Sequence, residues 1–206
     1  MDIVIIGAGN VGRALAAGWR RAGHKVTVAV RNPDDGKTAD LRREGFAVVA
    51  LGAAAKAGEV IALAVPWSAV RPAIQALGPL AGKIIIDAIN PLTADFELAV
   101  GHTDSAGETV ARLCPGARVV KAFNTTGANN MANSKYPGGK VMMPLAGDDA
   151  AAKETVMRLA ADLGFEPIDV GPLTMSRHLE PMAMLWIKLA YAQGLGREIA
   201  FALLKR

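Results

Sequence analysis

The chain has 206 residues, of which 51% are hydrophobic and 20% charged, a balance typical of a globular protein with one substantial domain. Its net charge is +4, but the basic residues are scattered and no aromatic residues interleave with them, so a nucleic-acid partner is not expected. The single cysteine, Cys114, excludes a disulfide framework and a thiolate metal cluster within the chain.

The two ends of the chain bear on where the protein works. The first apolar run begins at Asp2 and leaves no room for a leader before it, so we do not expect a secreted precursor. The most apolar late stretch, 181–195, is interrupted by Lys188 and is shorter than the roughly 20 residues that a membrane span needs. We therefore expect a cytoplasmic protein without a membrane partner.

Apolar runs of strand length alternate with helical patterns along most of the chain. In chain order we expect a strand at 2–6, a helix at 11–19, a strand at 25–30, a helix at 38–44, a strand at 47–49, a helix at 54–57, a strand at 59–65, a helix at 68–77, a strand at 83–87, a helix at 109–113, a strand at 118–123, a strand at 141–146, a helix at 148–163 and a strand at 166–170. This alternation predicts an α/β fold of the Rossmann type, with a doubly wound, mostly parallel sheet and a small C-terminal helical extension.

Two segments depart from the alternation. Residues 127–139 are rich in Asn, Gly and Ser, and we expect a functional loop there with at most one helical turn. From Met175 the pattern is helical almost to the end, apolar on most sides and broken by Gly194 and Gly196. Because such a helix needs more than one packing partner, we expect it at a dimer interface.

The strongest functional signal is the motif G-A-G-N-V-G at residues 7–12, which follows a buried strand and opens an amphipathic helix. Gly7 permits the tight turn, Gly9 lets the backbone approach a pyrophosphate, and Gly12 lets the helix pack closely on the strand. The amides and the positive end of the helix favour the anion. We predict a dinucleotide site here; the alternative is a glycine turn without a ligand.

The end of the second strand indicates which dinucleotide binds. An NAD site usually places a carboxylate there to accept hydrogen bonds from the ribose 2′-hydroxyl. Here Arg31 and Asn32 stand at that place. A guanidinium can fork onto a 2′-phosphate and stack against adenine, and Lys37 offers a second positive charge. NADP is therefore favoured over NAD, unless Arg31 is an ordinary surface arginine.

Three loops are expected to meet at the carboxyl edge of the sheet, where ligands of open α/β folds bind. They carry Ala64, Val65, Pro66 and Trp67 after the fourth strand, Asn90 after the fifth, and Asn124 after the sixth. Trp67 is either a wall of the nicotinamide pocket or a packing residue. Asn90 and Asn124 either hold a carboxamide or partner ring, or cap a turn or helix.

The side chains that acid–base chemistry needs are poorly placed. Dehydrogenases of alcohols and keto acids require a positioned acid or base. The candidates lie before the second strand (His24), after the fifth (His102), in the C-terminal region (His178) and inside the sixth strand (Lys121). Hydride exchange between nicotinamide and a flavin or deazaflavin needs mainly close, aligned rings. We therefore assign no catalytic residue and no metal ligand.

Further marks of the chain are V-P-W at 65–67, V-K-A-F-N-T at 120–125, A-G-D-D at 146–149, D-V-G-P-L at 169–173, and then Ser176, Arg177 and Glu180. With the glycine loop and Arg31, in this order and spacing, they resemble the F420-dependent NADP oxidoreductase family and the cytosolic NADPH domain of the six-transmembrane metalloreductases. The resemblance covers essentially the whole chain.

The resemblance implies that Asn10, Val11 and Arg31 contact NADP, and that Pro66 and Asn90 lie near the nicotinamide. It also implies that the 124–128 loop borders a second ring and that the chain is a homodimer through its C-terminal helices.

The chain departs from the family pattern at two positions beside Arg31. Val30 and Asn32 stand where the family commonly has a serine and a second basic residue, which weakens the expected 2′-phosphate selectivity. The run from Ser176 to Glu180 also fits a helix cap with an i,i+3 ion pair between Arg177 and Glu180, and we favour that structural interpretation.

Together these observations predict an enzyme, an NADPH-dependent oxidoreductase that moves hydride between NADP(H) and a flavin-like acceptor: coenzyme F420, a flavin (FMN or FAD) or a quinone. The alternatives are a non-catalytic NADP(H)-binding regulator and a small dehydrogenase of the hydroxyacid or pyrroline-carboxylate reductase type. We expect residues 1–147 to form the NADP-binding Rossmann domain. Residues 148–206 would form a C-terminal α/β extension whose apolar helices supply dimer contacts and part of the second-ring site.

Overall fold

The computed structural model describes residues 1–206, except for the side chain of Lys37. Its strands are β1 (Asp2–Ile6), β2 (Lys25–Val30), β3 (Ala47–Ala50), β4 (Val60–Leu63), β5 (Ile84–Asp87), β6 (Arg118–Lys121), β7 (Lys135–Tyr136), β8 (Gly139–Lys140), β9 (Met142–Gly147) and β10 (Glu166–Asp169). Eight of them form one sheet in the order β10-β9-β6-β5-β4-β1-β2-β3, and β7 pairs with β8 in a separate hairpin.

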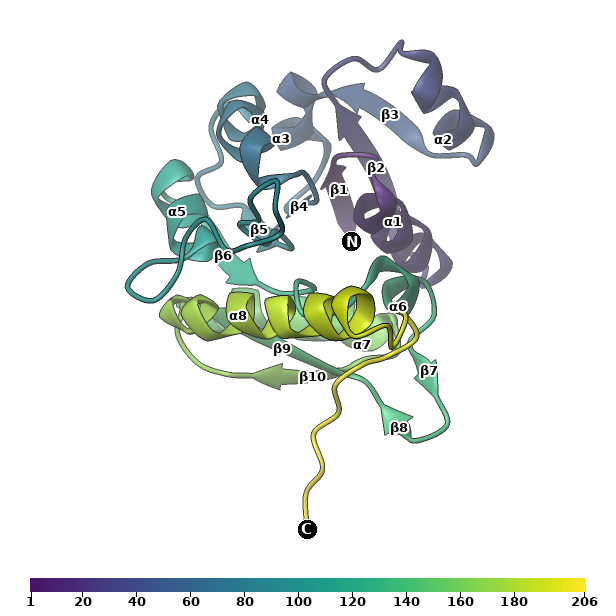
Figure 1. Cartoon of the computed structure of the whole chain (residues 1–206). Helices are drawn as coiled ribbons and strands as arrows, with labels where there is room; N and C mark the ends of the chain where they lie inside the picture. Colours follow the sequence, from purple (N-terminus) through teal and green to yellow (C-terminus); the bar gives the residue numbers. More distant parts are fainter.

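The helices cover both faces of this sheet (Figure 1). They are α1 (Asn10–Arg21), α2 (Ala39–Arg43), α3 (Ala54–Ala57), α4 (Val70–Leu77), α5 (Ala106–Leu113), α6 (Ala128–Ala132), α7 (Ala150–Asp162) and α8 (Ser176–Ile187). A wider helical stretch, Lys188–Ala192, prolongs α8.

The topology places β1 between β2 and β4, so the chain winds outward from β1 in both directions. This strand order is typical of doubly wound dinucleotide-binding folds. The sheet continues past β6 with β9, which runs antiparallel to β6 and pairs Val120 with Gly147, and ends with β10 parallel to β9. The prediction of a Rossmann-type α/β fold with a mostly parallel sheet is confirmed.

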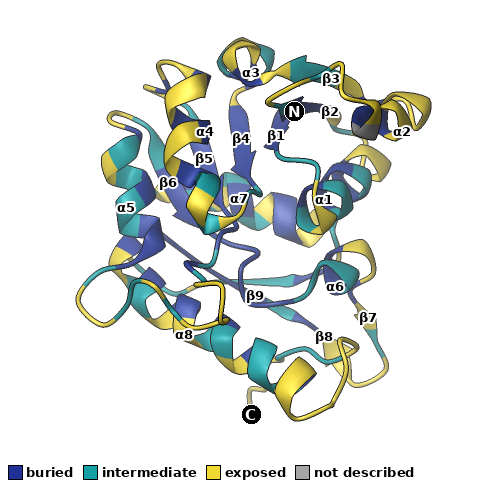
Figure 2. Ribbon diagram, turned by 45° about the horizontal axis from the view of Figure 1, so that its top comes forward, coloured by how far each residue is buried: buried dark blue, intermediate teal, exposed yellow. Residues whose placement is uncertain are grey.

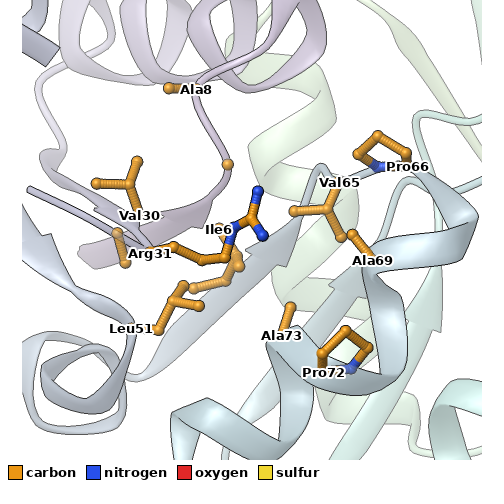
Figure 3. Close-up of a pocket in the computed structure, with 12 residues that line it drawn as sticks. Ile6, Ala8, Val30, Arg31, Leu51, Val65, Pro66, Ala69, Pro72 and Ala73 are labelled. Carbon is orange, nitrogen blue, oxygen red and sulfur yellow. The ribbon is translucent and has the colours of Figure 1, made fainter. Parts of the chain in front are cut away.

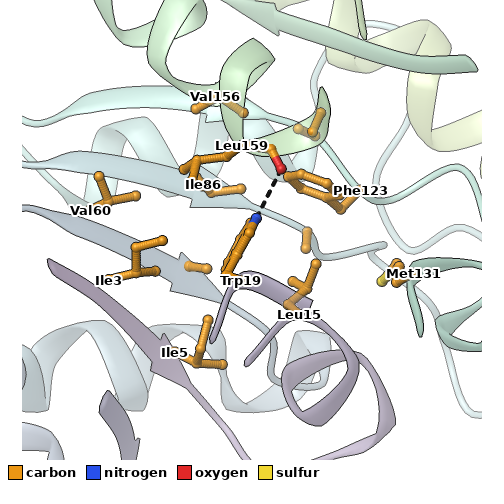
Figure 4. Close-up of a cluster of buried hydrophobic side chains, with 14 of the residues drawn as sticks. Ile3, Ile5, Leu15, Trp19, Val60, Ile86, Phe123, Met131, Val156 and Leu159 are labelled. Atoms are coloured by element: carbon orange, nitrogen blue, oxygen red, sulfur yellow. Dashed lines mark hydrogen bonds between the residues drawn. The ribbon is translucent and has the colours of Figure 1, made fainter. Parts of the chain in front are cut away.

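The two faces of the sheet bury two separate cores, because alternate side chains of a strand point to opposite faces. Ile3 and Ile5 of β1 pack on the side of α1 and α7, whereas Val4 and Ile6 pack on the side of α4 and α5. Figure 4 shows Trp19 of α1 inside the first core, where its indole nitrogen donates a hydrogen bond to the carbonyl of Leu159 in α7 at 2.9 Å. The central strands of the sheet are therefore buried, whereas the edge strands β3 and β10 are partly exposed and the outer helix faces are exposed (Figure 2).

The segment 127–139 holds more regular structure than we predicted. It begins with α6, as the expected helical turn, and continues into the β7–β8 hairpin. The Tyr136 hydroxyl donates to the side-chain oxygen of Asn130 at 2.8 Å, which ties the hairpin to α6. Strands of two residues each are too short to leave a periodic pattern in the sequence.

The C-terminal helix ends earlier than we predicted. Gly194 and Gly196 adopt φ values of +70° and +74°, in the left-handed region that terminates helices. The chain then folds back, so that the Trp186 indole donates to the carbonyl of Ile199 at 2.8 Å. Among the described residues, we find no helix with both the length and the apolar character needed to traverse a bilayer.

Candidate functional site

Three neighbouring cavities lie along the carboxyl ends of the strands. The first, about 260 Å³, opens between the ends of β1, β2 and β4, and the second, about 500 Å³, shares Ala8, Val30 and Arg31 with it. The third, about 700 Å³, begins at Val11 on the other side of the glycine loop and extends to α8. A long ligand laid across the glycine loop can therefore reach all three.

The glycine loop has the geometry that its sequence predicts. Gly7 has a φ of +104°, and a Cβ there would stand 2.5 Å from the carbonyl oxygen of Ala64. A Cβ on Gly12 would stand 2.3 Å from the carbonyl oxygen of Gly7. A Cβ on Gly9, in contrast, would meet no atom within 4 Å. Gly7 and Gly12 are thus required for packing, whereas Gly9 borders open space.

The first turn of α1 faces this open space with backbone amides. Gly9 is the N-cap and supplies no side chain, and the first turn contains no acidic residue. The Arg13 amide is the first to donate within the helix, to the Gly9 carbonyl at 2.9 Å. The amides of Asn10, Val11 and Gly12 come before it and have no acceptor within the helix. Amides and helix dipole together favour an anion at this place.

Arg31 follows β2 and lines both of the first two cavities. Figure 3 shows its side chain running from the end of β2 past Ile6, with the guanidinium directed towards Val65. Asn32 lines the second cavity as well. The Lys37 side chain, which we expected as a further charge, lies outside the described residues.

Sequence reasoning missed two charged residues of the second cavity, Arg13 and Asp35. Arg13 donates from Nε to the Ala8 carbonyl at 3.1 Å and reaches Glu44 at 3.5 Å. Its position in the first turn of the helix after the glycine motif was the signal that could have identified it. Asp35 adds a carboxylate to a cavity whose other charged lining residues are the two arginines.

The third cavity has mainly apolar and aromatic walls. Val11 and Asn90 line the side towards the sheet, and Trp186, Tyr191 and Phe96 line the opposite side. Tyr191 and Phe96 are 62% and 60% exposed, so they stand at the rim. Its only charged lining residue in the described structure, Lys188, is paired with Glu97 at 2.6 Å. The cavity suits a flat, largely apolar ring.

Two asparagines stand side by side on the sheet side of the third cavity, as their places after β5 and β6 predict. Asn90 donates from Nδ2 to the backbone carbonyl of Asn124 at 2.8 Å, and Asn124 donates from Nδ2 to Oδ1 of Asn90 at 3.0 Å. Asn124 also donates to the carbonyl of Leu179 in α8, again at 3.0 Å. These bonds hold α8 against the carboxyl edge of the sheet.

A buried group of three charged residues lies directly behind this pair. Lys121 at the end of β6 reaches Asp87 at 3.0 Å and Glu180 at 2.8 Å, and all three are at most 1% exposed. Glu180 accepts hydrogen bonds from the amides of Ala106 and Gly107 at the start of α5. Burial raises the pKa of Glu180, and the hydrogen bonds from Lys121 and Ala106 oppose the rise.

The Lys121 ammonium also donates to the carbonyl of Ile89, the residue before Asn90. The charged group therefore fixes the loop that carries Asn90 and the helix that carries Leu179 at the same time.

A family model described as "NADP oxidoreductase coenzyme F420-dependent" matches residues 2–91. A crystal structure from Arthrobacter sp. FB24, of a protein provisionally named an F420-dependent NADP-reductase, superposes over the full length of both chains with a TM-score of 0.92 and 32% sequence identity. The chain belongs to the F420-dependent NADP oxidoreductase family. It is thus an oxidoreductase of an NADP-dependent family.

The chain is also similar to part of a longer protein. Metalloreductase STEAP3 of Rattus norvegicus is 33% identical over 180 residues, which are 87% of this chain but 36% of that protein. The chain thus spans about a third of the length of this curated relative. A reductive aminase of Aspergillus terreus solved with NADPH and ethyl levulinate matches 94% of this chain and 62% of its own, with a TM-score of 0.70 at 22% identity; this likeness concerns the fold alone.

The family motif around Ser176 is not the local helix device that we favoured from the sequence. Arg177 pairs with Glu108 of α5 at 2.6 Å, and Glu180 faces Lys121, so no i,i+3 pair joins them. The Ser176 hydroxyl is buried without a hydrogen-bond partner among the described residues and caps nothing. The interpretation was wrong because the partners come from distant strands and from α5, which a local pattern does not reveal.

The predicted end of the sixth strand was also wrong. β6 ends at Lys121 and not at Phe123, so Lys121 lies at the tip of the strand and not inside it. Trp67 packs against the core on the α4 side and lines none of the three cavities, which favours the packing role. None of the three histidines lines these cavities either; His24 is bonded to Asp162 at 2.9 Å.

Proposed function

We propose that this member of the family is an NADPH-dependent oxidoreductase that transfers hydride between NADP(H) and a flat, flavin-like acceptor: coenzyme F420, a flavin such as FMN or FAD, or a quinone. The proposal rests on one observation: helix α1 contributes residues to two sites. Its first turn faces the open space at Gly9, and Val11 in the same turn lines the 700 Å³ cavity under α8. A nicotinamide held by this turn would therefore face that cavity.

The adenosine half of NADP(H) is assigned to the first two cavities. The open space at Gly9 and the amides of Asn10, Val11 and Gly12 suit the pyrophosphate. Arg31 and Asn32 are assigned to the 2′-phosphate, with Arg13 as a second cation beside them. Two guanidinium groups against the carboxylate of Asp35 leave this lining net positive, which supports NADP over NAD.

The nicotinamide half is assigned to the entrance of the third cavity. Ala64, Val65 and Pro66 follow β4, where Gly7 packs against Ala64 and Val65, and Asn90 and Asn124 line the sheet side of the third cavity. When bound, the cofactor supplies the hydride, and the chain contributes alignment and exclusion of water. No described His, Cys, Asp or Glu lines the cavity, Lys188 is paired with Glu97, and Tyr191 stands at the exposed rim, so a reaction without a side-chain acid fits it best.

The C-terminal part of the chain is assigned to the acceptor. We propose residues 1–147 as the NADP-binding part and residues 148–206 as the part whose helix α8 closes the acceptor cavity. The exposed apolar side chains of Leu185, Tyr191 and Leu195 near the rim support a homodimer through this helix. We propose a cytoplasmic enzyme whose partners are small-molecule redox acceptors.

The test is steady-state oxidation of NADPH with F420, FMN, FAD and a soluble quinone offered in turn. We expect turnover with at least one acceptor and a clear preference for NADPH over NADH. Tight NADPH binding without turnover on the whole panel would favour a non-catalytic regulator, and turnover with a hydroxyacid or an imino acid alone would favour a small dehydrogenase.

A further inference from the structure

The third cavity has one charged side chain, and that side chain lies at its open rim. Among the described residues that line the cavity, Lys188 is the only charged one, and its side chain is 45% exposed. Phe96 and Tyr191, which also line the cavity, are exposed aromatic residues. Because Lys188 both lines the cavity and is accessible to solvent, its ammonium group can be reached by a ligand that enters there.

The present partner of this ammonium group is a carboxylate from a neighbouring loop. Lys188 donates from Nζ to Oε1 of Glu97 at 2.6 Å, and the Glu97 side chain is 62% exposed. An ion pair this exposed contributes little to stability, because water solvates both charges well. Exchange of Glu97 for another anion therefore costs little free energy.

The loop that carries Glu97 is long, but its tip is held by internal hydrogen bonds. Residues 88–105 connect β5 to α5 without a helix or strand of their own, and loops of this length in compact domains are often functional. At the tip, the Thr93 amide donates to the Glu97 carbonyl at 2.8 Å, and the Glu97 amide donates to the Thr93 hydroxyl at 3.1 Å. Phe96, with a φ of +57°, adopts a left-handed conformation that is unfavourable for an aromatic residue. The tip thus holds Phe96 and Glu97 at the rim of the cavity.

On the opposite side of the ion pair, Lys188 begins a π-helical stretch, Lys188–Ala192. Helical turns of this kind are rare and occur frequently at functional sites. Tyr191 and Ala192 of the same stretch also line the cavity. The stretch therefore supplies the cavity with its cation and with one of its exposed aromatic residues.

We propose that Lys188 is a specificity-determining residue that selects acceptors whose flat ring carries an anionic side chain, and that Glu97 takes the place of this anion until the acceptor enters. The ring lies between the apolar and aromatic walls, and a phosphate of its side chain displaces Glu97 from the ammonium group. A phosphate monoester carries more negative charge than a carboxylate and accepts a charge-assisted hydrogen bond. The inference rests on the proposed function and narrows its acceptors, because a neutral quinone gains nothing from Lys188.

Two pairs of compounds test this selection, since the members of each pair share a ring and differ in their anionic side chain. They are FMN with riboflavin, and F420 with the phosphate-free ribityl deazaflavin that contains its ring. Saturating NADP+ is present throughout, so that the phosphate of FMN cannot occupy the place proposed for the 2′-phosphate. In low salt at pH 7.5, we expect wild type to bind the anionic member roughly three- to tenfold more tightly, as measured by fluorescence titration.

Two variants should move this affinity ratio in opposite directions. Lys188→Met should bring the ratio to about one by weakening the binding of the anionic member alone. Glu97→Gln removes the competing carboxylate and should raise the ratio above that of wild type. Lys140→Met, at an exposed lysine outside the three cavities, is the matched control and should keep the wild-type ratio. Thermal unfolding verifies that each variant is folded, and Lys188→Gln replaces Lys188→Met if the latter is not.

The inference and the proposed function fail in different ways. Wild-type ratios near one, or binding of neutral quinones alone, would overturn the inference. A folded Lys188→Met that loses both members of a pair equally would also overturn it, because the ion pair would then only hold the loop in place. If wild type does not bind NADP+ or oxidises NADPH with no acceptor, the proposed function itself is wrong, whereas turnover with ratios near one removes only the role of Lys188.

Discussion

In the glycine loop, single residues separate a role in folding from a role in binding: Gly12 is needed for packing, and Gly9 leaves room for a ligand. A methyl group on Gly12 would stand 2.3 Å from the Gly7 carbonyl oxygen, whereas a methyl group on Gly9 would meet nothing within 4 Å. We predict that Gly9→Ala keeps the thermal stability of the wild type but weakens NADPH binding at least about tenfold, because the methyl group occupies the space for the pyrophosphate. Gly12→Ala should lose about 1–3 kcal/mol of stability. Thermal unfolding and calorimetric titration measure both, and equal stability of the two variants would contradict the geometry.

Arg31 is the residue on which the choice of NADP depends. We predict that Arg31→Ala raises the Kd for NADPH about 10- to 100-fold, the worth of a charge-assisted hydrogen bond, and leaves the Kd for NADH almost unchanged. Arg158→Ala is the matched control, since it removes the same charge from an exposed site on α7. Equal loss of NADPH and NADH binding in Arg31→Ala would assign the guanidinium to adenine stacking alone.

At the scale of elements, the attachment of α8 to the sheet depends on a fully buried ammonium group. Lys121→Met would leave the carboxylates of Asp87 and Glu180 buried without their shared partner. We predict a loss of about 3–5 kcal/mol in the free energy of unfolding. Lys153→Met breaks the pair with Asp169 near the surface and should cost less than about 1 kcal/mol. Denaturant titration compares the two, and similar losses would show that the buried cluster contributes little.

A second link between α5 and α8 should depend on pH. The hydrogen bond from Arg177 holds the pKa of Glu108 below its ordinary value of 4.5. A lowered folded-state pKa stabilises the fold above the unfolded value and loses this effect as the pH falls through the folded value. Glu108→Gln should therefore unfold at a lower temperature than wild type at pH 7, and the gap should close in acid. The exposed Glu154→Gln should show no such gap, and a gap for Glu108→Gln that does not shrink as the pH is lowered below 4.5 would contradict the assignment.

The sequence predicted the elements well where each is defined by local pattern. The eight strands of the sheet and most helices follow from apolar periodicity and from the glycines that end them. The antiparallel direction of β9, the β7–β8 hairpin and the partners of Arg177 and Glu180 did not follow, because they depend on contacts between distant segments. A charged residue at the end of a buried strand, as at Lys121, was the available signal of a buried cluster.

In the molecule as a whole, the site is formed by residues near the N-terminus together with residues of the C-terminal region. The glycine loop belongs to the first twelve residues, whereas the far wall of the acceptor cavity comes from Ala183 to Ala192. The motifs predicted the first half of this arrangement, since the dinucleotide loop is continuous in sequence. The second half could be predicted only from the family resemblance. The residues of α8 that line the cavity are apolar, and in the sequence they cannot be told from core residues.

The most direct test of the account is a crystal structure of the protein with NADP+. We predict the pyrophosphate against the amides after Gly9, the 2′-phosphate within hydrogen-bond distance of Arg31, and the nicotinamide at the cavity between Val11 and α8, with a face open to a second ring. A nicotinamide turned away from that cavity, or a 2′-phosphate remote from Arg31, would contradict it.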